Sequence, residues 1–202
     1  MSIVNILKRL SQKRMLNKFG KFMQLSDKSV YEIGFLVDLR KLFEGKIYLE
    51  VEADCVIGGI FVFETSSGKI KIGKRTLISG SSMLVSKTSI IVGNDVIIAG
   101  GTILYDHDSH SVDWELRKND VKQQVIDYFE TGDQLFHKEW ENVKTSQIVI
   151  EDGVWIGRDV MILKGVTVGN HSVIGARSVV TRDVEPWTLV AGNPAQVIRR
   201  LK

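Results

Sequence analysis

Residues 150–185 read IEDGVW IGRDVM ILKGVT VGNHSV IGARSV VTRDVE, six consecutive hexapeptides that each begin with isoleucine or valine. The fifth position of every hexapeptide is valine or serine. A period of six fits neither an α-helix nor a single amphipathic strand, whose apolar positions recur every 3.6 and two residues. It fits a chain that folds into short flat faces, each turning its aliphatic residue inward. Because such repeats bury their apolar residues only when coils stack, the stretch predicts a parallel β-helix.

The same period runs with less regularity through residues 51–104. Apolar residues recur there mostly at intervals of six: Val51, Ile57, Phe63, Ile72, Ile78, Leu84, Ile90, Val92, Ile98 and Leu104. Glycine follows the aliphatic residue in many of the hexapeptides, where its missing Cβ is expected to ease tight chain reversal: Gly58, Gly73, Gly93, Gly157, Gly169 and Gly175. A β-sandwich is the alternative fold, but its strands alternate with period two between turns of varying length.

The composition indicates one soluble domain with a cap. The chain has 202 residues, of which 44% are hydrophobic and 25% charged, and it has no apolar run near the roughly 18 to 20 residues that span a bilayer. Lys8 and Arg9 interrupt any signal-peptide core, so we expect a cytoplasmic protein. The net charge of +3, without a recognised motif, gives no indication of nucleic-acid binding. The single cysteine, Cys55, excludes an internal disulfide and is expected to be buried in a coil.

Residues 1–30 are predicted to form an N-terminal helical cap on a β-helix domain of residues 31–202. Their apolar residues have near-helical spacing: Ile3, Ile6, Leu7, Leu10, Met15, Leu16, Phe19, Phe22 and Met23. One or two amphipathic helices would cover the exposed edge of the first coil. The six basic residues from Lys8 to Lys21 support a second interpretation, a weak association with anionic lipid at the inner face of the membrane.

Residues 106–147 abandon the period and predict an insertion, and the chain ends in a short C-terminal tail. Long excursions from a solenoid are usually functional or disordered, and the aromatic residues of this one indicate order. The stretch YDHDSHSVD at residues 105–113 places two histidines among three aspartates. Such a cluster can bind a metal ion, act as a general base whose tautomer a carboxylate fixes, or decorate an exposed loop without further function. The spacing alone does not choose between these three.

The repeats of residues 150–185, together with AGNPAQVIR at residues 191–199, closely resemble the hexapeptide-repeat acyltransferases. Galactoside, maltose, serine and xenobiotic acetyltransferases belong to that family, as do O-acetyltransferases of surface polysaccharides. The resemblance covers residues 47–105 and 148–202. It implies a left-handed β-helix, although parallel crossovers are generally right-handed. It also implies acetyl-CoA as acyl donor, no metal, and a homotrimer with active sites between subunits.

A second resemblance assigns the catalytic base. The stretch HSVDWELRKN at residues 110–119 is similar to the segment of galactoside and maltose acetyltransferases that begins with their catalytic histidine. His110 would then take the proton from an acceptor hydroxyl as its oxygen attacks the thioester. His107 does not align with that histidine, and His107 and Asp113 are the further catalytic candidates of the cluster. Ser111 stands where those enzymes often have proline, and the longer insertion leaves the acceptor open.

The resemblance also implies contacts with the coenzyme, from the pantetheine arm to the adenosine phosphates, to which arginine is suited. The candidates are Trp155, Gly157, Ala176, Thr181, Arg182 and Arg199. The predicted activity is O-acetylation of a sugar hydroxyl, in capsule or lipopolysaccharide biosynthesis, because the DHDSH form resembles that branch.

Several alternatives stay open within and outside this chemistry. A free sugar, an antibiotic or an amino sugar acetylated on nitrogen would be acceptors of the same general reaction. A non-catalytic β-helix used for assembly would explain the repeats but not the matched histidine segment. A β-helical carbonic anhydrase needs three histidines with a different spacing, which His107-Asp108-Ser109-His110 does not match.

Overall fold

The computed structural model describes residues 3–202, without the side chains of Ile3 and Lys8. The chain divides into two compact units. We call residues 1–106 and 146–202 the solenoid unit and residues 107–145 the arm. Each unit is described by itself.

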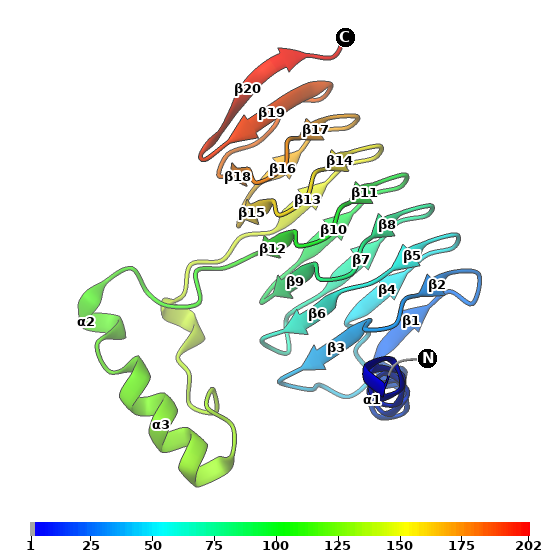
Figure 1. Cartoon of the computed structure of the whole chain (residues 1–202). Helices are drawn as coiled ribbons and strands as arrows, with labels where there is room; N and C mark the ends of the chain where they lie inside the picture. The colour runs from blue at the N-terminus through cyan, green and yellow to red at the C-terminus, as the bar shows by residue number, and fades with distance from the viewer. Residues whose placement is uncertain (1–2) are drawn as a thin grey trace. The chain divides into compact units, whose positions relative to one another are not determined.

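The solenoid unit is built from three parallel sheets, each of which receives one strand from every coil (Figure 1). Sheet A contains, in spatial order, β1 (Met23–Leu25), β4 (Leu49–Val51), β7 (Ile70–Ile72), β10 (Ile90–Val92), β13 (Ile148–Ile150) and β16 (Thr167–Val168). Sheet B contains β2 (Val30–Tyr31), β5 (Val56–Ile57), β8 (Leu77–Ile78), β11 (Ile97–Ile98), β14 (Trp155–Ile156), β17 (Val173–Ile174), β19 (Thr188–Gly192) and β20 (Ala195–Arg200). Sheet C contains β3 (Leu36–Leu39), β6 (Ile60–Phe63), β9 (Met83–Ser86), β12 (Ile103–Tyr105), β15 (Met161–Leu163) and β18 (Val179–Val180). The predicted fold, a left-handed parallel β-helix, is confirmed.

The first residues of the hexapeptides stack directly on one another inside the solenoid. In sheet B, Ile156 pairs with Ile98 of the preceding coil and with Ile174 of the next, and all three side chains are fully buried. Burial of one such side chain is worth about 1.5–3 kcal/mol. The period of six therefore produces one continuous core, in which the inward side chains of each coil pack against those of the next.

The glycines that follow the aliphatic residues serve close packing between coils and not chain reversal. A Cβ added to Gly157 would lie 2.7 Å from the backbone nitrogen of Ala176 in the next coil. The left-handed backbone conformation falls two residues later, on Asp159 after Gly157 and on Asp95 after Gly93. The expectation that these glycines reverse the chain was therefore wrong at these positions. Their missing side chain is needed because the next coil passes so close.

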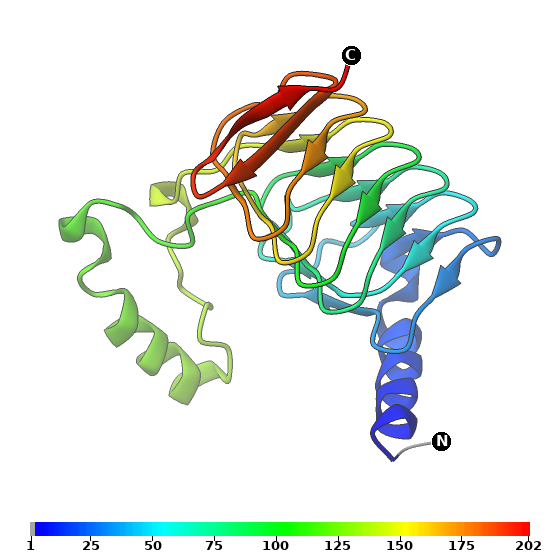
Figure 2. The ribbon, with the colours of Figure 1, turned by 45° about the horizontal axis from the view of Figure 1, so that its top comes forward.

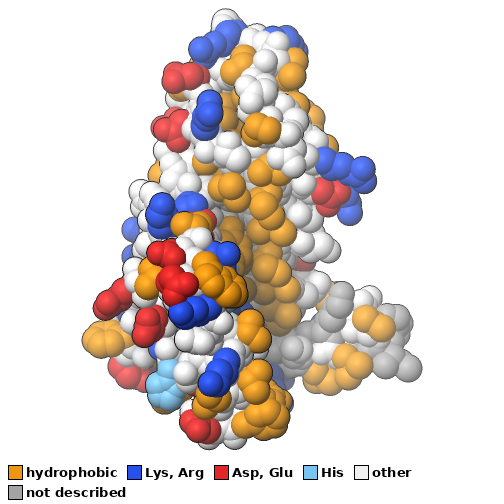
Figure 3. Space-filling view, turned by 90° about the vertical axis from the view of Figure 1, so that its left-hand side faces the viewer, with side chains coloured by type: hydrophobic (Ala, Val, Ile, Leu, Met, Phe, Trp, Pro, Cys, Tyr) orange, Lys and Arg blue, Asp and Glu red, His pale blue; other side chains and the backbone are white. Residues whose placement is uncertain are grey.

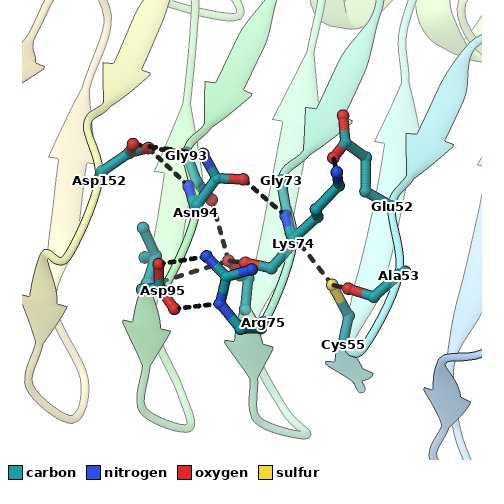
Figure 4. Close-up of polar contacts among 12 residues, drawn as sticks. Glu52, Ala53, Cys55, Gly73, Lys74, Arg75, Gly93, Asn94, Asp95 and Asp152 are labelled. Carbon is teal, nitrogen blue, oxygen red and sulfur yellow. Dashed lines mark hydrogen bonds and ion pairs between the residues drawn. The ribbon is translucent and has the colours of Figure 1, made fainter.

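Polar side chains at the corner that follows sheet A bond one coil to the next (Figure 4). The side chain of Asn94 accepts a hydrogen bond from the backbone nitrogen of Lys74 at 2.9 Å, and Asp152 accepts one from the backbone nitrogen of Asn94 at 2.7 Å. Arg75 forms a two-pronged ion pair with Asp95, with distances of 2.6 and 2.7 Å. The hydrogen bonds and charge of Arg75 hold the pKa of Asp95 below its usual range. These side chains satisfy corner backbone groups that the sheets do not pair.

The N-terminal end of the solenoid is covered by α1 (Ile3–Phe19) and the short 3₁₀ helix η1 (Gly20–Phe22). Met15 and Phe22 are buried in the core there, whereas the first half of α1 extends away from the coils (Figure 2). The first coil begins at Met23, because β1 pairs in parallel with β4. The solenoid therefore begins eight residues before the predicted boundary at residue 31.

The C-terminal end of the solenoid is closed by a hairpin. Strands β19 and β20 are antiparallel and extend sheet B, with Gly192 opposite Ala195 at the turn (Figure 1). Cys55 is buried in the core, as predicted, and its thiol donates to the carbonyl of Gly73 at 3.1 Å.

Within residues 3–202, no helix has the length and apolar character needed to cross a bilayer.

Candidate active site

A buried carboxylate fixes the point at which the chain leaves the solenoid. Asp106 has no exposed surface, and its side chain accepts hydrogen bonds from the backbone nitrogens of Lys87, Thr88 and Ser89 at 2.7, 2.8 and 2.9 Å. The carbonyl of Asp106 also accepts from the backbone nitrogen of Ser146 at 3.0 Å, where the chain returns. The points where the chain leaves and re-enters the solenoid are therefore held together just after β12 of sheet C.

The arm is closed at its own base. His107 and Thr145 form an isolated antiparallel bridge, and the backbone nitrogen of Asp108 donates to the carbonyl of Lys144 at 3.0 Å. Between these ends lie α2 (Trp114–Arg117), α3 (Asp120–Thr131) and the 3₁₀ helix η2 (Trp140–Asn142). The insertion is thus ordered, as its aromatic content predicts.

His110 lies in the turn before α2 and is held by a carboxylate. Its Nδ1 is 2.5 Å from Oδ2 of Asp120, the first residue of α3. Its backbone nitrogen donates to the carbonyl of Asp108 at 2.7 Å across Ser109, which has a left-handed φ of 63°. A carboxylate that accepts from Nδ1 leaves Nε2 with the lone pair, and this is the tautomer that a general base requires. The side chain of His110 is 41% exposed, so an acceptor can reach it.

Arg117 supports the turn that carries His110. Its guanidinium donates to the carbonyls of Ser111 and Val112 at 3.1 and 2.5 Å, and it lies 5.7 Å from the ring centre of Trp114. The arginine of the matched motif therefore fixes backbone next to the histidine.

Asp113, a catalytic candidate from the sequence, has a structural contact of its own. Its carboxylate accepts from the backbone nitrogen of Glu115 at 2.9 Å, which makes it the N-cap of α2. The carboxylate that contacts His110 is instead Asp120, which the sequence analysis did not single out. A catalytic role for Asp113 stays a prediction.

His107, the other histidine of the cluster, is buried. Only 3% of the residue is exposed, and its ring lies edge-on to Trp140 with ring centres 5.5 Å apart. An imidazole in this position is shielded from any acceptor, whereas His110 is accessible. The geometry of the arm therefore favours His110 as the base.

A second histidine and aspartate pair uses another carboxylate of α3, that of Asp127, with His137 from the segment after the helix, and was also missed by the sequence analysis. Asp127 is buried, and its carboxylate accepts from the backbone nitrogen of His137 at 2.9 Å, from Nδ1 of His137 at 2.8 Å and from Gln123 at 2.8 Å. Burial raises the pKa of Asp127, but these hydrogen bonds outweigh it and hold the pKa below its usual range. The seven-residue spacing of Asp120 and Asp127 was the available signal, since it puts both on one helix face.

The arm contains a polar cavity of about 640 Å³. Its lining is dominated by carboxylate and amide side chains: Ser111, Glu115, Leu116, Asn119, Asp120, Gln123, Gln124, Asp127, Gln134, His137, Lys138, Glu139, Asn142 and Val143. The cavity thus extends from Asp120, the partner of His110, to the second pair, Asp127 and His137.

The candidates for coenzyme contact all lie in the last coils of the solenoid unit. Gly157 and Ala176 are stacked at the corner between sheets B and C, and the carbonyl of Gly157 accepts from Thr102 at 3.1 Å. Trp155 is 54% exposed on the outer face of sheet B. Three further candidates are exposed, the first two after β18 and the third on β20: Thr181, Arg182 and Arg199. The structure brings Gly157 and Ala176 together, keeps Thr181 and Arg182 adjacent after β18, and places Trp155 and Arg199 on two strands of sheet B.

No cluster of three or more histidine, cysteine or carboxylate side chains suited to a metal ion occurs among the residues that the structure describes.

Comparison with known proteins places the chain in a family. The bacterial transferase hexapeptide family (six repeats) matches residues 147–182, and the hexapeptide repeat of succinyl-transferase matches residues 69–106. A hexapeptide-repeat acetyltransferase of Vibrio cholerae, solved with acetyl-CoA, is 30% identical, with 95% of this chain and 78% of that chain covered and a TM-score of 0.59. Galactoside acetyltransferase in complex with coenzyme A is 28% identical, with 100% of this chain and 84% of that chain covered and a TM-score of 0.56. The chain belongs to the hexapeptide-repeat acetyltransferase family.

Three further proteins are similar to this chain or to a part of it. The polySia-specific acetyltransferase NeuO is 30% identical, with 86% of this chain and 66% of that chain covered and a TM-score of 0.62. Chloramphenicol acetyltransferase of Agrobacterium fabrum is 54% identical over 52 residues, which are 26% of this chain and 25% of the relative. The chloramphenicol acetyltransferase of Klebsiella aerogenes is 47% identical over 57 residues, which are 28% of this chain and 27% of the relative. The chain thus matches about a quarter of the length of these curated relatives.

The contact between Asp120 and His110 predicts a fixed tautomer. In ¹⁵N-labelled protein at a pH where the ring is neutral, nuclear magnetic resonance should show the proton of His110 on Nδ1. Asp120→Ala should return the ring to a mixture of tautomers. Asp113→Ala, the matched control, should leave the tautomer unchanged and cost about 0.5–2 kcal/mol as a lost helix cap. An unchanged tautomer in Asp120→Ala would contradict the assignment.

Proposed function

We propose that the protein transfers an acetyl group from acetyl-CoA to a hydroxyl of a sugar. The observation that carries the proposal is the accessible imidazole of His110, oriented by Asp120, in a chain of the hexapeptide-repeat acetyltransferase family. Nε2 of His110 removes the hydroxyl proton while the oxygen attacks the thioester carbonyl. The tetrahedral intermediate then collapses, the sulfur leaves, and the imidazolium returns the proton to it. The products are an O-acetyl ester and free coenzyme A.

The donor is proposed from the structural neighbours and from exposed groups of the solenoid. The Vibrio cholerae structure contains acetyl-CoA, and the galactoside acetyltransferase structure contains coenzyme A. In our proposal, Trp155, Gly157 and Ala176 accompany the pantetheine arm. The cationic side chains of Arg182 and Arg199 are exposed and suit the phosphates, because a guanidinium binds phosphate oxygens in a bidentate manner. Thr181, next to Arg182, adds a hydroxyl donor.

A sugar of a surface polysaccharide is the proposed acceptor. The names of two neighbours support a sugar acceptor in general, galactoside acetyltransferase and the polySia-specific acetyltransferase NeuO. The charge of that sugar is a separate question, because polySia is acidic and a galactoside is neutral. An antibiotic hydroxyl is the second candidate, because the chloramphenicol acetyltransferases share up to 54% identity with a part of the chain. Thiol release from acetyl-CoA, measured against sugars, lipid-linked glycans and chloramphenicol, distinguishes the two.

Removal of the base should abolish most of the turnover. His110→Ala is expected to lower kcat by about a hundred- to ten-thousand-fold, the usual contribution of a general base, with the free energy of unfolding little changed because the side chain is accessible. His107→Ala is the comparison and should retain more activity in its folded fraction. Thiol release measured on the folded fraction of each variant tests this. Near-wild-type turnover in His110→Ala together with an inactive, folded His107→Ala would reverse the assignment.

We also propose that the chain forms a homotrimer with active sites between subunits. Sheets B and C each present an outward column with one apolar residue from every coil, and apolar surface of this extent usually marks an interface. The residues of this column in sheet C are Leu36, Ile60, Met83, Ile103, Met161 and Val179. Those of sheet B are Val30, Val56, Leu77, Ile97, Trp155, Val173 and Leu189. Figure 3 shows a column of hydrophobic side chains along the solenoid.

Contact between two different faces generates a closed ring, and the family resemblance sets three as the expected number. A charge on the apolar face should therefore dissociate the assembly. Wild-type protein should have three times the mass of the 202-residue chain by light scattering, whereas Met161→Glu should be monomeric and at least tenfold less active. Gln24→Glu, a charge on the outer face of sheet A, is the control and should remain assembled. A fully active monomeric wild-type protein would remove the proposal of shared sites.

A membrane-surface association through α1 is proposed from its exposed first half. Ile6, Leu7 and Leu10 are exposed apolar residues of this half, and Lys13 and Arg14 are exposed beside them in a helix without any acidic residue. Apolar side chains flanked by cations bind anionic lipid surfaces.

Charge at the tip of α1 should remove this association. Wild-type protein should sediment with anionic vesicles at physiological salt and much less with neutral vesicles. The double variant Leu7→Glu and Leu10→Glu should stay in the supernatant with its fold intact, since both side chains are exposed. Deletion of residues 1–25 is a poorer test because it removes β1. No sedimentation of wild-type protein with anionic vesicles would refute the association.

A further inference from the structure

We infer that the cavity of the arm binds a glycosyl unit of the acceptor and selects sugars without negative charge. The inference rests on the proposed acetyl transfer to a sugar and specifies the class of sugar. At about 640 Å³, the cavity has the volume of a small-molecule site. One of its lining residues is Asp120, whose carboxylate holds the ring of His110. A glycan in the cavity would therefore lie close to the proposed base.

The polar face of α3 is what shapes the cavity. Asp120, Gln123, Gln124 and Asp127 recur at helical spacing and all line it. Asp120 and Asp127 are about 10 Å apart along the helix axis, given a rise of 1.5 Å per residue. Each carboxylate fixes Nδ1 of one histidine, at 2.5 Å for His110 and 2.8 Å for His137. An extended ligand along this face would meet the imidazole of His137 near one end and Asp120, the partner of His110, near the other.

The cavity offers hydrogen-bonding groups that the arm does not use itself. The side-chain amides of Asn119, Gln124 and Gln134 form no hydrogen bond with the rest of the described chain, residues 3–202. Each amide supplies both donors and an acceptor, which matches the hydroxyl groups of a sugar. His137 adds the lone pair of Nε2, because Asp127 accepts from its Nδ1. Few ligands other than polyols satisfy so many neutral polar groups at once.

The charges of the lining exclude anionic ligands. Four carboxylates border the cavity, against one ammonium group, that of Lys138: Glu115, Asp120, Asp127 and Glu139. Only part of this charge is balanced by a cation, since Glu115 pairs with Lys118 at 2.5 Å whereas Glu139 accepts from the neutral amide of Asn142 at 3.1 Å. A uronic or sialic acid would bring a further carboxylate into a negative cavity and be repelled. Neutral sugars and amino sugars would not be repelled by these carboxylates.

The test compares two ligands that differ only at C6, which is a neutral hydroxymethyl group in one and a carboxylate in the other. Equilibrium binding of methyl galactoside and methyl galacturonoside to the full-length protein is measured by ligand-observed nuclear magnetic resonance. The neutral glycoside should bind at least tenfold more tightly. Glu139→Lys, which lies outside the proposed catalytic machinery, should narrow that preference at least threefold. Equal binding of both glycosides, or no effect of Glu139→Lys, would overturn the charge selection.

A second pair of variants tests the location of the site. The double variant Gln124→Leu and Gln134→Leu should weaken binding of the neutral glycoside about tenfold, as expected for the loss of two hydrogen bonds. Gln24→Leu, the same exchange on the solenoid, should leave binding unchanged. If the double variant binds like wild type while acetyl transfer to sugars proceeds, the cavity is not the acceptor site and the proposed function survives. If the cavity binds neutral sugars but none is acetylated, the proposed function fails instead.

Discussion

The stacking of parallel coils about 4.8 Å apart is the constraint on which the rest of the structure depends. Every inward residue must fit between its counterparts in the adjacent coils, as Ile156 does between Ile98 and Ile174. The corners must let backbones pass closely, and therefore the position after the aliphatic residue is glycine at Gly157 and Gly93. The result is a stack of coils with three sheets around one buried core, and the alternate side chains of each strand face outward.

The arm places the proposed chemistry on a separate unit. Asp106 uses several backbone donors to fix the exit from the solenoid, and the bridge between His107 and Thr145 closes the base of the arm. Within the arm, one face of α3 supplies the carboxylates that orient His110 and His137. We propose a division of labour on this basis, in which the solenoid would offer the donor contacts and the arm the base and the acceptor cavity.

The sequence predicted the coils well because the hexapeptide period reports burial directly, one inward residue per strand. It singled out His110 as the candidate base through a local motif, and that role stays a prediction. It did not single out Asp120, because the contact between Asp120 and His110 depends on how α3 folds back on the turn. The contact between Asp127 and His137 was not predicted for the same reason, because it also depends on how the chain folds after α3. The start of the first coil at Met23 was missed because three-residue strands are too short to be distinguished from the end of an apolar helical pattern.

The most direct measurement is a crystal structure of the full-length chain with coenzyme A and a sugar bound together. The account predicts that the acceptor oxygen lies about 3 Å from Nε2 of His110, with the thiol end of the coenzyme on the far side of that oxygen and its phosphates near Arg182 or Arg199. A coenzyme bound away from the last coils, or a different imidazole beside the acceptor oxygen, would contradict it.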